Sequence, residues 1–349
     1  MFTDTGSPHY AKAISGVRCA LHGTLSFVSG DSKSEKCMPH DVTMSGINQP
    51  VLYQMPIPMR TLSISVVLIA ASLLLGGCST AQIVARGASP IIDHGVTAMN
   101  RETDYELARA SIPANIKMIE ALLLADPGNT AYRIQAAMAF YGYSMAFVDE
   151  ADSVRAIKLY QRAMAHAELA LADAGLPIAK LKEQPASLGV ALAQLDSRAV
   201  PALFWSASAW AKLIELQLDD PERLAELPVV EALMRRALVL DEAYYHGSAH
   251  VFFGAYYGGR APMFGGDFAR SAQHFDRAAQ LTQNRMLWID VYRAQYLQRQ
   301  MNDRAAFHQT LSKVVNAPDS AKIDPDLNLA NMLAKRKAAE LLAQEEDLF

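Results

Sequence analysis

Cysteine is scarce in this chain, and its positions exclude most of the chemistry that thiols supply. There are three cysteines among 349 residues: Cys19 and Cys37 lie near the N-terminus, and Cys78 follows a long apolar run. The sequence after Cys78 has no cysteine, so it can form no disulfide and no cysteine-based metal or redox site. A chain of this length can instead be stabilised by the packing of its apolar side chains.

Other features that would point to particular functions are also missing. Asp and Glu number 36 against 32 Lys and Arg, which gives a net charge of −4 at pH 7. Nucleic-acid-binding proteins carry a basic patch instead, so we expect no nucleic-acid partner. The sequence has no nucleophile elbow, no phosphate-binding loop and no paired carboxylates. We therefore predict that the protein is not an enzyme and has no cofactor.

One apolar run stands out in the N-terminal part. A short positive start and 17 uncharged residues (61–77) end in two glycines directly before Cys78. These are the parts of a secretory signal peptide, with the cysteine where bacterial lipoproteins are cleaved and acylated. We predict residues 59–77 as a lipoprotein signal peptide and Cys78 as the lipidation site. The alternative is a transmembrane helix, although about 20 apolar residues are needed to span a bilayer.

This interpretation sets the compartment and the domain boundaries. Residues 1–58 are turn-rich and precede the signal peptide, so we interpret them as a misassigned start or a disordered leader; the alternative is the cytoplasmic tail of a signal-anchored protein. Residues 78–103 are expected to form a lipidated tether with a first apolar segment, and residues 104–349 the folded domain. Two acyl chains on Cys78 would hold the protein on a lipid bilayer. Ser79, where an aspartate favours inner-membrane retention, suggests the periplasmic face of the outer membrane.

The folded part has an almost wholly helical pattern. Apolar residues recur every three or four positions, with Pro or Gly between segments and no convincing strand. Alanine–leucine segments ending in an Asp or Thr recur at 121–126, 237–241 and 278–282, which is typical of degenerate tetratricopeptide repeats. We predict an all-α fold, a degenerate tetratricopeptide-like helix-pair superhelix interrupted by an insertion at 175–198. The expected segments are a first helix at 104–124, pairs at 130–149/152–172, 200–218/228–240, 243–258/267–281 and 286–300/303–315, and a capping helix at 326–346.

The stretch 244–275 is the densest in aromatic, glycine and histidine residues. Arg260, flanked by Tyr256, Tyr257 and Phe264, could clamp a ligand carboxylate through two parallel hydrogen bonds. It could instead tie the glycine-rich loop around it to helix carbonyls or to an acidic neighbour. The sequence leaves both roles open for this arginine.

Other residues of this stretch have structural interpretations. Asp267 is placed to cap the helix that follows the loop. His246 and His250 have the four-residue spacing of a zinc-binding helix, but the glutamate of that motif is missing, so we expect no metal. The aromatic residues are predicted mainly as repeat core, with the lining of an apolar cavity as the alternative. They are Phe204, Trp205, Trp210, Phe252, Phe253, Tyr256 and Tyr257.

Several segments together carry a family resemblance. The lipoprotein signal and the degenerate repeats are accompanied by LDEAYYHG at 240–247, GGRAPMFGGD at 258–267, PALFW at 201–205 and the ending 331–349. In these features the chain resembles the TatT family, the T component of tripartite ATP-independent periplasmic (TRAP) transporter systems.

The resemblance implies a lipid-anchored periplasmic protein that forms a homotrimer and binds a TRAP-type periplasmic substrate-binding protein. It also implies a channel through each protomer, lined by aromatic residues, through which a small apolar or carboxylate ligand passes to the binding protein. The ligand-binding residues expected on this basis are Arg260, Tyr256, Tyr257, Phe264 and Trp205. The alternative function is a tetratricopeptide adaptor lipoprotein that scaffolds envelope protein complexes.

Overall fold

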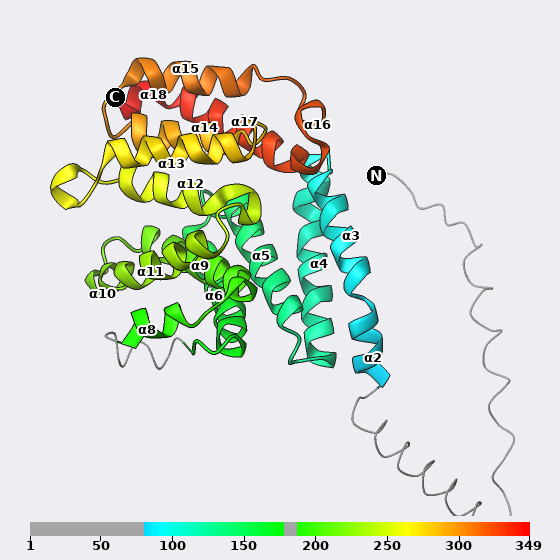
Figure 1. Ribbon diagram of the computed structural model, residues 1–349. Helices are drawn as coiled ribbons and strands as arrows, with labels where there is room; N and C mark the ends of the chain where they lie inside the picture. Colours follow the sequence, from blue (N-terminus) through cyan, green and yellow to red (C-terminus); the bar gives the residue numbers. More distant parts are fainter. Residues whose placement is uncertain (1–79, 178–186) are drawn as a thin grey trace, which may run out of the picture. The chain divides into compact units, whose positions relative to one another are not determined.

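The computed structural model describes residues 80–177 and 187–349 (Figure 1). In these ranges the chain forms helices and turns, and no strand occurs among the described residues, which confirms the predicted all-α class. The predicted signal peptide, Cys78 and residues 1–58 lie outside the described residues. None of the helices in the described ranges is long and apolar enough to cross a membrane.

The long helices match the predicted segments to within a few residues. Before the repeats come α2 (Thr80–Gly87), α3 (Ser89–Asn100) and α4 (Tyr105–Ala125). The predicted pairs are α5 (Thr130–Phe147) with α6 (Ser153–Asp173), α9 (Val200–Glu215) with α11 (Leu227–Leu240), and α12 (Tyr244–Gly258) with α13 (Phe268–Leu281). The last pair consists of α14 (Trp288–Tyr292), which continues into the π-helical turn η4 (Arg293–Gln298), and α15 (Arg304–Val315). The remaining elements are α8 (Leu188–Ala193), α10 (Pro221–Ala225), α16 (Ser320–Ile323), α17 (Asn328–Ala343), α18 (Glu345–Leu348) and the 3-10 turns η2 (Ser197–Ala199), η3 (Pro262–Phe264) and η5 (Pro325–Leu327).

Short polar side chains begin many of these helices. Asp267 accepts the backbone N–H of Arg270 at the start of α13, as predicted. Each such cap satisfies backbone donors that the first helical turn leaves free, and contributes about 1 kcal/mol. The caps of the other long helices of this kind are Asp104 of α4, Asn129 of α5, Asp152 of α6 and Asp303 of α15.

Neighbouring helices pack against one another largely in chain order. Helix α5 packs on α6, α6 on α9, α9 on α11, and α12 on α13. Small side chains allow close approach: α6 completely buries Ala156, Ala163, Ala167 and Ala170. This stacking of helix pairs is the arrangement expected of a degenerate helical repeat.

The described helices have hydrophobic cores of their own. All described residues belong to one compact unit. Its largest core lies among α5, α6, α9 and α11 and buries Trp210 and Phe140. Each large apolar side chain buried in this way stabilises the fold by about 1.5–3 kcal/mol. Residues 80–349 therefore contain the packing that a separately folding domain requires.

The start of α12 differs from the predicted continuous helix over 243–258. Tyr245, His246 and Gly247 have φ values of 46°, 60° and 69°, so these three residues form a left-handed turn before the right-handed helix resumes. A Cβ atom on Gly247 would lie 2.9 Å from Leu281 Cδ1 of α13. Glycine is favoured there by both its conformation and its close packing. The prediction was wrong at these residues because contacts between helices, which periodicity does not report, hold the turn.

Candidate functional site

An apolar cavity of about 480 Å³ lies among α5, α9, α12 and η4, and we call it the front cavity. Its size falls in the range of small-molecule sites, which are mostly apolar with a few placed polar groups. Aromatic rings and methionines dominate its wall. They are Tyr141, Met145, Phe204, Trp205, Tyr245, Phe252, Tyr256, Met286, Tyr292 and Tyr296.

A second apolar cavity, of about 270 Å³, lies among α3, α4, α5 and α17, and we call it the rear cavity. Almost all of its wall is aliphatic, sulfur-containing or aromatic. Its apolar lining includes Ile91, Ile92, Met99, Ile112, Met118, Ile119, Met138, Phe147, Trp288, Leu329 and Leu333.

The two cavities adjoin each other. Four residues line both of them: Gly142 and Met145 of α5, Tyr245 of α12, and Met286 just before α14. These four residues therefore lie between a cavity bounded by α9 and α12 and a cavity bounded by α3 and α17.

The tyrosines of the front cavity are surrounded by protein but remain accessible. Burial raises the pKa of Tyr292 to about 12, and burial also raises the pKa values of Tyr141 and Tyr296 well above the ordinary range. All three rings nevertheless keep accessible surface. The two observations agree because the accessible surface faces the cavity. The Tyr296 hydroxyl donates to Glu215 Oε1 at 2.8 Å.

Arg260 lines the front cavity and has the loop-supporting role that the sequence left open. Its Nε donates to the Tyr256 carbonyl oxygen at 2.9 Å, which ties the loop to the end of α12. Its guanidinium carbon lies 3.8 Å from the centre of the Tyr256 ring, a cation–π contact. The same guanidinium opposes the rise that burial causes in the Tyr256 pKa, and its charge helps to lower the pKa of Glu231. Arg260 therefore supports the loop and interacts with the Tyr256–Glu231 pair in the wall of the cavity.

Tyr256 is held beneath Arg260 by an acidic partner. Its hydroxyl donates to Glu231 Oε2 at 2.7 Å, and Glu231 also pairs with Arg235. Burial would raise the pKa of Glu231, but the hydrogen bonds from Tyr256 and Arg235 outweigh it and lower that pKa. The carboxylate therefore stays ionised and fixes the tyrosine that Arg260 stacks on.

The structure brings together three of the five predicted ligand-binding residues. Arg260, Tyr256 and Trp205 all line the front cavity, and the Trp205 indole N–H donates to the Tyr244 hydroxyl at 3.1 Å. Tyr257 is buried outside the cavity wall, where its hydroxyl accepts from Arg235 at 3.1 Å. Phe264 is 70% exposed in the loop that extends beyond α12 and α13 in Figure 1.

A charged cluster in the wall of the front cavity was not predicted. Lys212 Nζ lies 2.8 Å from Asp149 Oδ2 and 2.9 Å from Glu215 Oε2, and the Tyr160 hydroxyl donates to Asp149 at 3.0 Å. Burial of Lys212 would lower its pKa, but the two carboxylates outweigh burial and raise it. The ammonium therefore stays protonated and is no nucleophile. The sequence feature that could have indicated this cluster is the pair Lys212 and Glu215 on the otherwise apolar helix α9.

The histidines form a pair that the sequence pattern did not suggest. His246 lies in the left-handed turn, so it does not share a helical face with His250. His250 Nδ1 instead lies 2.8 Å from His274 Nδ1, and His250 Nε2 lies 3.2 Å from Glu242 Oε2. Because Glu242 can only accept, His250 donates to it and accepts from His274. No group of His, Cys, Asp or Glu in the described ranges is arranged to hold a metal ion.

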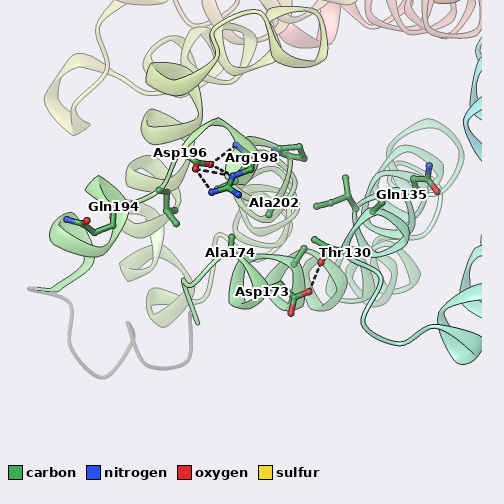
Figure 2. Close-up of a pocket in the computed structure, with 14 residues that line it drawn as sticks. Thr130, Gln135, Asp173, Ala174, Gln194, Asp196, Arg198 and Ala202 are labelled. Atoms are coloured by element: carbon green, nitrogen blue, oxygen red, sulfur yellow. Dashed lines mark hydrogen bonds and ion pairs between the residues drawn. The ribbon is translucent and has the colours of Figure 1, made fainter. Parts of the chain in front are cut away.

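A third hollow, of about 620 Å³, lies between α5, α6 and the start of α9 (Figure 2). Its charged groups are already paired. Arg198 binds the Asp196 carboxylate through Nε and Nη2, and the Thr130 hydroxyl donates to Asp173 at 2.7 Å. Because these groups are occupied, we take the front and rear cavities as the candidate site.

A comparison with family models matches residues 101–349 to the TRAP transporter T-component family. The chain belongs to this family. The match confirms the resemblance inferred from the sequence and includes the whole front cavity, whereas the α3 residues of the rear cavity precede the matched range. As a TRAP T component, the protein has an accessory role in a TRAP transport system. No curated protein sequence matches the chain.

Proposed function

We propose that this T component is a lipid-anchored periplasmic protein that binds a small apolar or carboxylate ligand and passes it to a TRAP-type periplasmic substrate-binding protein. The observation that supports this most is that two apolar cavities in one chain of this family adjoin each other and share four lining residues. Joined into one passage, the two cavities would be the route of the ligand, and the protein would act without catalysing a reaction.

Three residues of the front cavity are the proposed ligand contacts. The guanidinium of Arg260 would bind a carboxylate through charge-assisted hydrogen bonds. Tyr256 and Trp205 would contact the apolar part of the ligand, as would the methionines, whose flexible side chains adapt to different shapes. The proposed ligand is thus an amphiphile with one acidic group and a hydrocarbon portion.

The proposed attachment is through lipid on Cys78, on the periplasmic face of the outer membrane. A homotrimer is part of the same proposal and derives from the family resemblance. The adaptor alternative requires a groove lined along its length by polar side chains. The apolar wall of the joined cavities favours the relay of a ligand instead.

Capture of a partner tests this proposal. Immobilised protein comprising residues 80–349 is incubated with the periplasmic fraction of the same cell, and bound proteins are identified by mass spectrometry. We expect specific recovery of a TRAP-type substrate-binding protein. Recovery of envelope-assembly proteins without any such binding protein would favour the adaptor instead.

A further inference from the structure

Tyr245 lies where the front and rear cavities meet. Among the four residues that line both cavities it is the aromatic one; the others are Gly142, Met145 and Met286. The junction therefore consists of one large rigid ring, two flexible thioether side chains and a position with no side chain. A ring in such a place decides how wide the connection is.

The ring of Tyr245 is held on one side and open on the other. Its centre lies 4.8 Å from that of Trp205 and 5.8 Å from that of Phe204, both of which are buried. Tyr245 itself is 42% exposed, and its hydroxyl forms no hydrogen bond with any described residue. Burial nevertheless raises its pKa. Its accessible surface therefore faces the joined cavities.

The backbone that carries this ring is strained. Tyr245 has φ 46° and ψ 55°, and His246 has φ 60° and ψ 33°, both in the left-handed region. Residues with a side chain avoid this conformation, and it persists only where the surrounding structure enforces it, commonly at functional positions. Here the Ser248 hydroxyl donates to the Tyr245 carbonyl at 2.6 Å, and Gly247 packs against Leu281. A right-handed turn would direct the tyrosine side chain elsewhere, so the strain is what keeps the ring at the junction.

Gly142, which also lines both cavities, independently supports a functional role of the junction. Gly142 lies inside α5, where a glycine weakens the helix relative to alanine. A Cβ atom built on Gly142 would meet nothing within 4 Å, so helix packing does not require glycine there. Gly142 thus lines both cavities although helix packing does not require a glycine there. The absence of a side chain at this position leaves the passage wide.

We propose that Tyr245 divides one continuous ligand passage into a front and a rear chamber and thereby sets the length of the apolar chain that the protein accepts. The inference rests on the proposed function, because it takes the passage to be the ligand site. A straight-chain carboxylate bound through Arg260 fills the front chamber first, and its end meets the Tyr245 ring. Longer chains enter the rear chamber only when the ring moves aside. Gly142 leaves open space at the same junction.

The test is a chain-length series of straight alkyl carboxylates, from octanoate to octadecanoate, titrated calorimetrically into residues 80–349 below their micelle concentrations. For the wild type, affinity rises about fourfold with each methylene until the chain reaches the ring, and then levels off. Tyr245→Ala moves this plateau to longer chains. Tyr245→Phe keeps the ring and therefore retains the wild-type plateau. Gly142→Leu narrows the junction with a new side chain, so the plateau stays where it is or moves to shorter chains.

Each outcome has a separate meaning. If the wild type and folded Tyr245→Ala reach the plateau at the same chain length, Tyr245 does not divide the passage. The proposal that the ligand is an alkyl carboxylate would not be affected by that result. If that variant fails to fold, Tyr245→Gly removes the ring without the cost of the left-handed conformation and serves instead. Binding of none of these carboxylates by the wild type refutes the ligand class in the proposed function, and the inference falls with it.

Discussion

At the scale of single residues, Arg260 combines a loop contact with a place in the cavity wall. Its Nε donates to the Tyr256 carbonyl, and its guanidinium stacks on the Tyr256 ring at the front cavity. Local spacing was sufficient to associate this arginine with Tyr256, because four residues are one helical turn. It was not sufficient for Tyr257, since adjacent helical residues point about 100° apart and only one of them can face the cavity.

Substitution of Arg260 by glutamine is expected to lower the affinity for an alkyl carboxylate about tenfold or more, because a hydrogen bond to a charged group contributes about 1.5–3 kcal/mol. Binding of the corresponding alkyl alcohol should change little. Titration calorimetry with decanoate and decanol measures both. Arg270→Gln is the matched control, because Arg270 pairs with Asp267 and does not line the cavity. Equal losses in the two variants would contradict a ligand role for Arg260.

The histidine pair makes stability depend on pH. Burial, His250, Arg235 and Arg270 lower the pKa of His274 to about 4, and burial lowers the pKa of His250, although Glu242 opposes this. Between pH 6.5 and 4 the unfolded chain binds more protons than the native protein, so the free energy of unfolding falls as pH falls. The full stabilisation is present above pH 6.5.

The expected loss between pH 7 and 4.5 is about 1–3 kcal/mol, since the pair is only partly buried and titrates as a coupled unit. His274→Phe keeps a ring stacked on Phe253 and Tyr257 and should reduce this dependence. Urea unfolding at several pH values measures the effect, and His94→Gln, at an exposed histidine, controls for the loss of any histidine. An unchanged pH profile in His274→Phe would assign the dependence to other groups.

At the scale of elements, two glycines lie in helices for different reasons. Gly247 has positive φ and would bring a Cβ atom within 2.9 Å of Leu281, so Gly247→Ala should destabilise the protein by about 1–2 kcal/mol. Gly142 has open space around it in a regular helix, so Gly142→Ala should stabilise by about 0.5–1 kcal/mol. Thermal or urea unfolding compares the two variants. Effects of the same sign would show that the left-handed turn at α12 is not required by the fold.

The helices themselves were largely predictable, because their signals are local. Caps such as Asp267 and the three- to four-residue recurrence of apolar side chains identify a helix from neighbouring residues alone. The left-handed turn at Tyr245 was not predictable in this way, and neither was the π-helical turn η4, because both depend on contacts with other helices. The Lys212 cluster joins α6, α9 and the turn after α5, and it has the same origin.

At the scale of the whole molecule, the passage arises only when distant segments meet. Ile92 of α3 and Leu329 of α17 line the same rear cavity, and no pattern within either segment predicts that the two residues meet. The aromatic residues of the sequence divide accordingly: Trp210 and Phe253 are core, Tyr256 lines the cavity, and Trp205 belongs to the core while it also borders the cavity. The predicted partner, homotrimer and lipid anchor rest on the family and the sequence, and they remain proposals.

The anchor can be tested on the complete chain. Replacement of Cys78 by serine removes the thioether-forming side chain, so we expect an uncleaved precursor or a protein without lipid. Labelling with a radioactive fatty acid and separation of membrane from soluble fractions detect the change. Normal processing and unchanged membrane partitioning of this variant would contradict acylation at Cys78.

The most direct measurement of the central claim is the transfer of a bound ligand to the substrate-binding protein. The T component is loaded with a fluorescent alkyl carboxylate and mixed rapidly with the TRAP-type binding protein that it captures. The relay predicts that transfer accelerates with the concentration of the binding protein and exceeds the rate of unassisted dissociation. Transfer that proceeds at the dissociation rate, whatever that concentration is, would contradict a relay through the joined cavities.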